Sequence, residues 1–302
     1  MAAESADLKA GRRAYYGRDY AEAVAQFKPL ADSGDPTAQR FLAYLYILGA
    51  GVPKDPAKAA ALFHSAAHGG DLLAAYSVGA LYMQGLGVQK SDTEAVNWFR
   101  GAAQKELPNA QVALGSMYRF GRGVPQDLAE ATRWYRAAAE QGHARALTIL
   151  GYCYSEGMGV KQDNGEAVRL LRVAASKEYP EAQYLLGLAY VHGTGVSIDF
   201  VEASKWFSRA AEWGEPRAQF NIGVSYATGQ GVGQDPVQAH CWFTLAAAQG
   251  QSHASDAVKQ LERSMRPEQV SAARRLAEAW RPKERVYDEN TPDWEHLALA
   301  SE

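Results

Sequence analysis

Apolar residues recur along this chain every three to four residues, and the whole pattern repeats with a period of 36 residues. Each copy starts at an alanine, which we number as repeat position one. The six starting alanines are Ala38, Ala74, Ala110, Ala146, Ala182 and Ala218. Positions one, five and nine fall on one stripe of a helix, so each copy predicts a first helix with a single buried face.

Tyrosine occupies position nine of all six copies, and glycine occupies position six of all but the first, which has Ala43. The glycines are Gly79, Gly115, Gly151, Gly187 and Gly223. Glycine inside a helix costs about 1 kcal/mol relative to alanine. Its recurrence at one position therefore predicts that a neighbouring side chain needs the space.

A glycine-rich connector follows each first helix, as in GAGVPKD from Gly49 to Asp55. Its glycines are expected to end the helix and turn the chain with positive φ angles. The aspartate or serine that closes the connector is followed by proline or, three residues later, by glutamate, which is typical of a helix start. The motif resembles a phosphate-binding loop only superficially, because such a loop follows a strand and this one follows a helix.

The second helix of each copy carries alanines beside large rings, as in Ala131, Trp134, Tyr135, Ala138 and Ala139. This spacing predicts an apolar stripe on which small residues permit close helix approach. We interpret these rings as core and not as a ligand cage, which would have to recur in every copy. One helical hairpin buries too little to fold alone, so the copies must stack into an all-α solenoid.

The unit AxxxLGxxYxxGxGVxxDxxxAxxWxxxAAxxG resembles the Sel-one-like repeat, a relative of the tetratricopeptide repeat, in six units over residues 38–253. The resemblance implies a right-handed superhelix of helix-turn-helix repeats. Residues 1–37 resemble a tetratricopeptide-like capping repeat, and 254–280 are expected to form C-terminal capping helices. We expect residues 281–302 to be a flexible tail, with Trp294 and Leu297 alternatively forming a helical turn that docks on the array or a partner.

The chain has 302 residues, 47% hydrophobic residues and a formal net charge of -3. This charge disfavours a nucleic-acid partner, and no apolar run is long enough to insert into a membrane. The two cysteines, Cys153 and Cys241, lie at different repeat positions and are expected to be buried free thiols.

The N-terminus lacks the basic and apolar segments of a signal peptide. It is compatible with a cytoplasmic protein or with a mature exported chain. The resemblance favours a periplasmic or exported bacterial protein, with a cytoplasmic location as the alternative.

The first helices have a second face, at positions three, seven and ten, that is rich in aromatic residues and arginine. The resemblance to tetratricopeptide units implies that this is a concave surface holding a protein or peptide partner, because tyrosine and arginine are common at interface hot spots. The alternative is that neighbouring first helices bury these residues against each other. The predicted partner-binding residues are Arg40, Tyr44, Tyr76, Met83, Arg119, Tyr152, Tyr184 and Phe220, beside Val112 and Val191.

The leading hypothesis is a monomeric, non-catalytic scaffold or adaptor without a cofactor or metal, acting in an envelope or signalling pathway. Two alternatives stay open. The first is a hydrolase directed at the cell wall or β-lactams. Some cysteine-rich relatives described as penicillin-directed hydrolases resemble this chain in fold, although no SxxK, GxSxG or HExxH motif occurs here. The second is a sensor of a small acidic or sugar ligand that uses Arg119, Arg122 and Arg145.

Two further groups of polar residues have plainer explanations. The three arginines are expected to be solvated or paired with Glu130, Glu140 and Glu156. His64 and His68 are one helical turn apart, but no carboxylate or thiol nearby completes a zinc site, so we interpret them as a surface pair.

Overall fold

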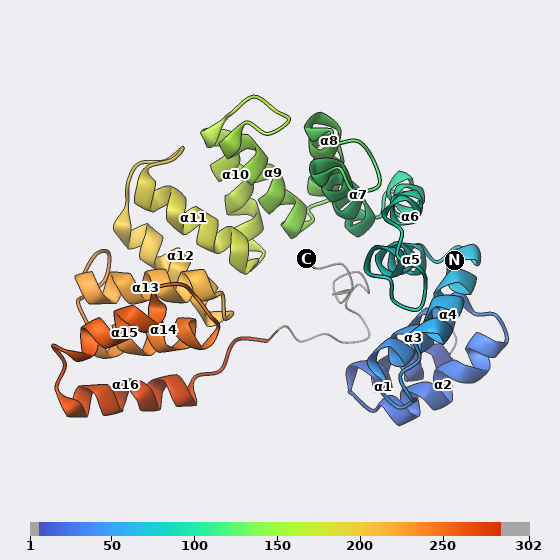
Figure 1. Cartoon of the computed structure of the whole chain (residues 1–302), viewed down its shortest axis with the longest axis horizontal. Helices are drawn as coiled ribbons and strands as arrows, with labels where there is room; N and C mark the ends of the chain where they lie inside the picture. The colour runs from blue at the N-terminus through green and yellow to red at the C-terminus, as the bar shows by residue number, and fades with distance from the viewer. Residues whose placement is uncertain (1–5, 285–302) are drawn as a thin grey trace. The chain divides into compact units, whose positions relative to one another are not determined.

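A computed structural model describes residues 6–284, which form sixteen α-helices and no strand (Figure 1). The all-α prediction is thereby confirmed. These residues divide into two compact units, 6–141 and 142–284. Residues 1–5 of the expected N-terminal cap and residues 285–302 of the expected tail, with Trp294 and Leu297, lie outside the described residues.

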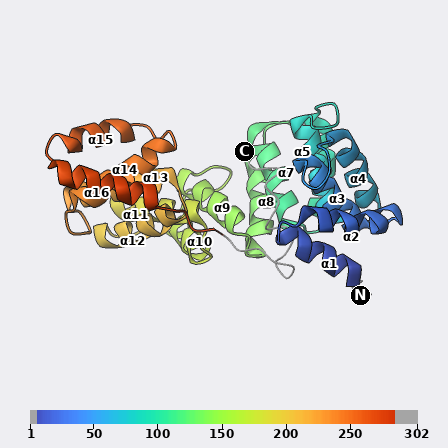
Figure 2. The ribbon, with the colours of Figure 1, turned by 90° about the horizontal axis from the view of Figure 1, so that it is seen from below.

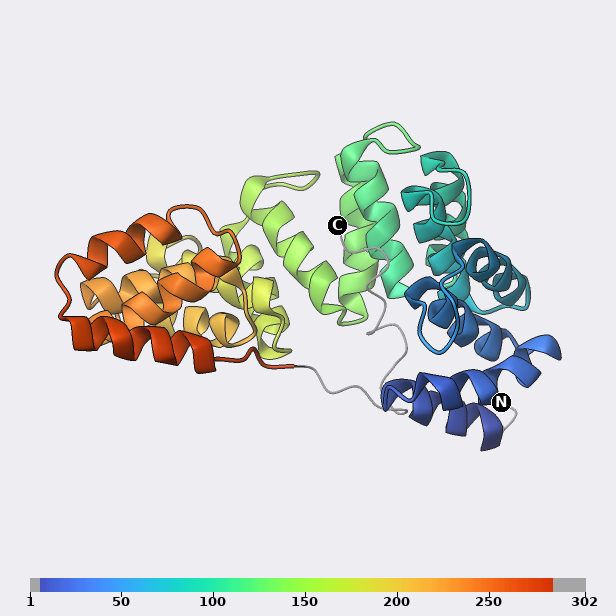
Figure 3. The same ribbon diagram turned by 60° about the horizontal axis from the view of Figure 1, so that its bottom comes forward.

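The first unit contains α1 to α8, with α1 and α2 at its N-terminal end (Figure 3). The helices are α1 (Ala6–Tyr16), α2 (Tyr20–Asp32), α3 (Pro36–Leu48), α4 (Pro56–His68), α5 (Leu72–Gln84), α6 (Asp92–Gln104), α7 (Pro108–Phe120) and α8 (Leu128–Glu140). From α3 to α14, odd-numbered helices are the first helices of the repeats and even-numbered helices are the second.

The second unit contains three repeats and the two helices that close it, and α14, α15 and α16 lie together at its end (Figure 2). The helices are α9 (Ala144–Glu156), α10 (Asn164–Ser176), α11 (Pro180–His192), α12 (Phe200–Glu212), α13 (Pro216–Thr228), α14 (Pro236–Ala248), α15 (Ala254–Glu262) and α16 (Pro267–Ala279).

The helix ends agree with the predicted signals. Each first helix of the six repeats ends at a glycine in the left-handed conformation, with φ between 65° and 75°. Each second helix begins after a side chain that accepts a backbone N–H; Asp127, for example, accepts from the nitrogen of Glu130 at 2.9 Å. These caps satisfy donors and acceptors that every helix terminus leaves open.

The glycines at position six make room for a large side chain of the partner helix. A Cβ on Gly187 would lie 2.6 Å from the ring of Phe207, and Gly79 and Gly115 meet Phe99 and Tyr135 in the same way, whereas Gly151 meets Leu171. The predicted need for space is therefore confirmed, and its source is the central large residue of the second helix in the same repeat, which is aromatic in four of these five repeats.

Within each unit, the second glycine of the connector joins neighbouring repeats. Gly195 and Gly231 both have positive φ, and a Cβ on either would collide with the backbone carbonyl of Asn164 or Phe200, respectively. Those carbonyls belong to the first residue of the second helix in the preceding repeat. The connector thus lies directly on the start of the neighbouring helix, which the sequence pattern alone does not indicate.

Buried glutamines at position two also connect repeats. Gln39, Gln111, Gln183 and Gln219 donate to the carbonyls of Ala31, Ala103, Ala175 and Ala211 at 3.1 to 3.4 Å. Each bond covers a carbonyl near the C-terminus of the preceding second helix, where acceptors lack intrahelical partners.

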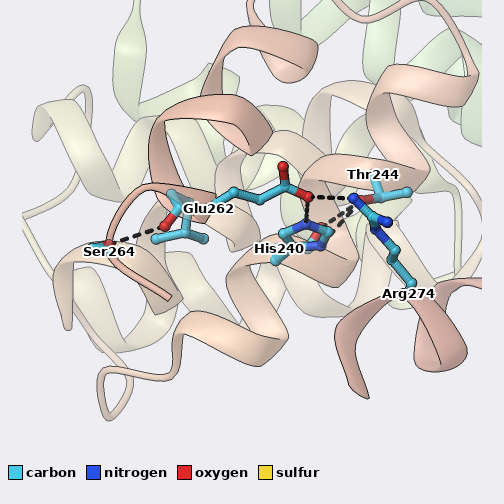
Figure 4. A network of polar contacts seen from close by, with 6 residues as sticks. His240, Thr244, Glu262, Ser264 and Arg274 are labelled. Atoms are coloured by element: carbon cyan, nitrogen blue, oxygen red, sulfur yellow. Dashed lines mark hydrogen bonds and ion pairs between the residues drawn. The ribbon is translucent and has the colours of Figure 1, made fainter. Parts of the chain in front are cut away.

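Polar contacts join α14, α15 and α16 at the end of the second unit (Figure 4). The buried His240 on α14 places Nε2 2.9 Å from Glu262 Oε1 on α15, and Arg274 on α16 donates to the same oxygen at 2.8 Å. The hydrogen bonds from His240 and Arg274 lower the pKa of Glu262. Beyond α16, Lys283 donates its backbone N–H to the carbonyl of Glu212 at 2.7 Å, so residues 280–284 return to α12.

Candidate functional site

The predicted binding residues lie on the first helices, in two separate units. Together, the side chains at positions three, seven and ten form what we call the first-helix face. Arg40, Tyr44, Tyr76, Met83 and Arg119 belong to the first unit, and Tyr152, Tyr184 and Phe220 belong to the second. Each group is therefore considered on its own.

Arg40 is part of the interior of the first unit. Its side chain is 3% exposed, and Nε donates to Asp71 Oδ2 at 2.8 Å. Its guanidinium also lies 4.7 Å from the centroid of the Phe41 ring. Because Asp71 caps the next first helix, α5, this ion pair joins two neighbouring repeats.

Tyr44 and Tyr76 are buried as well. The Tyr44 hydroxyl lies 3.0 Å from Ser77 Oγ on α5, its ring packs against Phe63, and burial raises its pKa. Tyr76 is 3% exposed and packs against Phe99. Arg40, Tyr44 and Tyr76 thus follow the alternative raised by the sequence, in which neighbouring first helices bury this face against each other.

The other two residues of the first unit are partly exposed. Met83 is half-buried at the end of α5. Arg119 is also half-buried and lies 5.0 Å from the centroid of the Phe120 ring, which is 62% exposed. This end of α7 therefore presents the Phe120 ring to solvent beside the half-buried guanidinium of Arg119.

In the second unit, the aromatic residues of the first-helix face are partly exposed. Tyr152 is 38% exposed, whereas Tyr184 and Phe220 are half-buried. The rings of Tyr184 and Phe220 pack against Phe207 and Phe243, with centroids 6.1 Å and 5.4 Å apart. Burial raises the pKa of Tyr184, so its hydroxyl stays protonated at neutral pH.

A charged group missed by the sequence argument accompanies Tyr184. The Arg217 guanidinium lies 4.5 Å from the centroid of the Tyr184 ring, donates to Glu215 at 2.6 Å, and lies 3.9 Å from Glu181. The signal was present in the sequence, because Arg217 occupies the first turn of the next first helix. Finding it required comparing Tyr184 with the residue 33 positions later, in the following repeat.

The three arginines proposed for a small ligand are divided between the two units. Arg122 binds both oxygens of Asp92 at 2.9 and 3.3 Å, and Glu130 pairs with Arg133. The predicted pairing of Arg122 with a glutamate is wrong, because the connector carries Arg122 over the start of α6, where Asp92 lies. Arg145 belongs to the other unit.

The described residues supply little for other chemistry. Within 6–284, no group of three histidine, cysteine or acidic side chains is arranged to hold a metal. His68 Nδ1 lies 2.7 Å from the carbonyl oxygen of His64, and both rings pack on Trp98. Cys153 and Cys241 are buried free thiols, as predicted, and burial raises the pKa of Cys241 to about 11.

No helix in the described part of the chain has the length and apolarity needed to cross a bilayer.

Comparison with solved structures finds several helical-repeat proteins. A Sel1 repeat protein from Oxalobacter formigenes is 31% identical, with a TM-score of 0.71, and the match covers 80% of this chain and 97% of that one. A protective antigen of uropathogenic Escherichia coli displaying an SLR fold is 27% identical over 87% of this chain and 72% of that one, with a TM-score of 0.39. An immunity protein from Pseudomonas aeruginosa is 21% identical over 78% of this chain and 83% of that one, with a TM-score of 0.47.

No curated protein matches this chain closely enough to be counted as a relative. The Sel1 repeat family, in contrast, matches at residues 36–71, 72–106, 108–143, 144–179, 180–214 and 216–251. Because these matches span most of the chain, the protein belongs to the Sel1 repeat family, whose members generally act as scaffolds for protein–protein interaction and are typically non-catalytic.

Proposed function

We propose that this protein is a non-catalytic scaffold or adaptor that binds a partner protein on the first-helix face of its second unit. The observation that carries the proposal is the accessible aromatic group of Tyr152, Tyr184 and Phe220, with Arg217 lying over one ring. Tyrosine and arginine contribute large contact areas and hydrogen bonds at protein interfaces, where a few such residues carry most of the binding energy.

The charges on this face favour a partner segment of mixed polarity. Arg217 is held by Glu215 and lies near Glu181, so its charge is largely compensated before a partner arrives. Its guanidinium still has donors that are not used by the bond to Glu215, and the rings supply apolar area. We therefore expect a peptide or loop with aromatic or aliphatic side chains and carbonyl acceptors, and not a strongly charged polymer.

The test compares the parent protein with a Tyr152→Ala/Tyr184→Ala variant in pull-downs from the source organism. Circular dichroism and thermal melting establish that the variant is folded, and Val173→Ala removes an equally exposed apolar side chain from α10 as a control. We expect a partner that is retained by the parent and the control and lost by the double variant.

An Arg217→Glu variant covers the case in which the double variant folds poorly, because it reverses a charge on the same face without removing a ring. A partner captured in equal amounts by the parent, the double variant and Arg217→Glu would overturn the proposal.

We also propose that the protein acts in a bacterial envelope or signalling pathway, in the periplasm and not in the cytoplasm. This part rests on the family resemblance of the repeats and of their N-terminal segment. Fractionation of the source organism, followed by immunoblotting, tests it. Detection in the cytoplasmic fraction alone would contradict the proposed periplasmic location.

A further inference from the structure

The fifth repeat exposes three large apolar side chains where its connector meets its second helix. Ile198, Phe200 and Val201 are 60%, 39% and 51% exposed, and we call them the apolar patch. Single exposed apolar residues are ordinary on protein surfaces, whereas neighbouring ones mark interaction sites. The patch lies at the start of α12 and is separate from the first-helix face proposed above.

Comparison with other repeats shows what Ile198 replaces. Glutamine stands at the same position in three repeats, and the Nε2 atoms of Gln126, Gln162 and Gln234 donate to the carbonyls of Arg119, Ser155 and Ala227 at 2.8, 2.7 and 2.8 Å. Each bond covers a carbonyl at the end of the first helix.

Ile198 cannot donate such a bond. Among the described residues, no side chain donates to the equivalent carbonyl, that of Val191. The fifth repeat therefore combines exposed apolar area with a backbone carbonyl to which no described side chain donates, at a position where the fourth and sixth repeats carry a donating glutamine.

The surroundings of the patch are acidic. The connector of the fifth repeat lies on the start of α10, and that of the sixth lies on the start of α12, so successive second helices begin side by side. Asp163, Asp199 and Asp235 cap these helices. Nearby Glu166 and Glu202 are already paired with Arg169 and Lys205. Of the connector residues around the patch, only Lys161 opposes the three aspartates in charge.

The size of the patch limits its occupant. A stable dimer interface buries about 800 Å² on each partner, and three side chains fall well short of that area. A second copy of the chain is therefore a poor fit, whereas a short segment can cover the patch. The acidic surroundings favour lysine or arginine beside the apolar side chains of that segment.

We propose that the apolar patch docks a short segment of a partner protein that carries large aliphatic side chains interleaved with basic residues. The aliphatic side chains cover Ile198, Phe200 and Val201, and a backbone N–H of the segment donates to the carbonyl of Val191. The basic side chains lie toward the three capping aspartates. This surface gives the scaffold a second contact with chemistry different from that of the first-helix face.

Fluorescence anisotropy with three labelled ten-residue peptides tests the proposal. One alternates leucine with lysine, one alternates leucine with glutamate, and one alternates serine with lysine. The full chain should bind the leucine–lysine peptide at least tenfold more tightly than either of the others. Ile198→Gln should weaken that binding at least tenfold without lowering the melting temperature, because glutamine restores the bond made by Gln162 and Gln234 in their own repeats.

Two control variants make the result specific. Leu48→Gln removes a side chain that is 58% exposed in the first unit, and Leu276→Gln removes one that is 43% exposed on α16 in the second unit, so both should bind the peptide like the parent. The proposal is overturned if no peptide binds or if Ile198→Gln leaves the affinity unchanged. Equal binding of the serine–lysine or leucine–glutamate peptide, or equal weakening by Leu48→Gln, would overturn it as well.

Discussion

The tyrosines at the same repeat positions are buried to different extents in the two units. In the first unit, Arg40 and Tyr76 at position three and Tyr44 at position seven are buried in contacts with neighbouring helices. In the second unit, Tyr184 and Tyr152 at those positions stay partly or largely accessible. A residue's place within a repeat therefore does not decide whether it is core or surface.

The difference lies in the next repeat along the chain. Tyr44 is held by Ser77, whereas the residue at the equivalent place beyond Tyr152 is Leu185, which offers no hydroxyl group. Arg40 finds the buried carboxylate of Asp71, whereas Tyr184 meets Arg217, whose charge stays near solvent. Pairs of residues about 33 positions apart thus determine which stretches of the first-helix face are closed.

The largest predicted effect is a difference in stability loss between variants of Arg40 and Arg217. Arg40→Met should destabilise the protein by about 3 to 5 kcal/mol, because it leaves the carboxylate of Asp71 buried without its partner. Arg217→Met, in the second unit, should cost about 1 kcal/mol or less, because the Arg217 side chain is 42% exposed and its ion pair stays partly solvated. Urea denaturation followed by circular dichroism measures both.

The control for this pair is Arg40→Met/Asp71→Asn, which removes the orphaned charge and keeps a capping side chain at residue 71. It should recover part of the lost stability. If Arg217→Met lowers the free energy of unfolding as much as Arg40→Met does, the predicted difference between the two units is wrong.

The next largest effect is the pH dependence of stability that His143 should cause. His143 caps α9 at the position where Asp71 caps α5, and burial, with a smaller contribution from Arg145, lowers the His143 pKa to about 4. The unfolded chain therefore binds more protons than the folded one between the two pKa values. Stability should fall as the pH drops from 6.5 towards 4, by at most about 1.4 kcal/mol per pH unit from this residue.

His143→Asp should retain the cap and remove this contribution. Denaturation midpoints measured at pH 7, 6, 5 and 4.5 should decline less steeply in the variant than in the parent. Parallel profiles would show that the cap of α9 responds to acid no differently from that of α5.

A smaller effect should distinguish two buried glutamines. Gln111 donates to Ala103 and accepts from Gln141 at 2.9 Å, whereas Gln183 donates to Ala175 but its Oε1 has no partner among the described residues. Gln111→Leu should therefore cost about 1 to 2 kcal/mol and Gln183→Leu less, since the latter also removes an unsatisfied oxygen. Urea denaturation midpoints of the two variants provide the measurement. Equal losses in the free energy of unfolding would contradict the prediction.

The smallest effect concerns two tyrosine hydroxyls. Tyr44→Phe should cost about 0.5 to 1.5 kcal/mol, because Ser77 already donates to the carbonyl of Leu73 and depends on Tyr44 as its donor. Tyr184→Phe keeps the ring beneath Arg217 and should change stability by less than about 0.5 kcal/mol. Thermal melts resolve the two cases, and a larger loss for Tyr184→Phe would reverse the assignment of buried and accessible tyrosines.

Much of the fold was predictable because it depends on local chemistry that recurs. Asp127 and its equivalents cap helices within three residues, and Gly121 ends a helix by its own backbone conformation. The need for glycine at position 187 could be predicted as well, because the Phe207 ring that requires the space belongs to the same helical hairpin. The candidate site was predicted less completely. Arg217 was missed, Arg122 was given the wrong partner, and the exposure of Ile198 was not anticipated.

The sequence by itself determined the helices, their ends, the repeat length and the family, because each depends on residues close together in the chain. Only the tertiary structure decided which faces remain open. Arg40 is buried against Asp71 at the start of the following repeat, Tyr152 stays 38% exposed, and no described side chain donates to the carbonyl of Val191, because Ile198 has no donor. Such outcomes require the stacked repeats themselves, since hydrogen bonds and packing act over a few ångströms in space and not over positions in a motif.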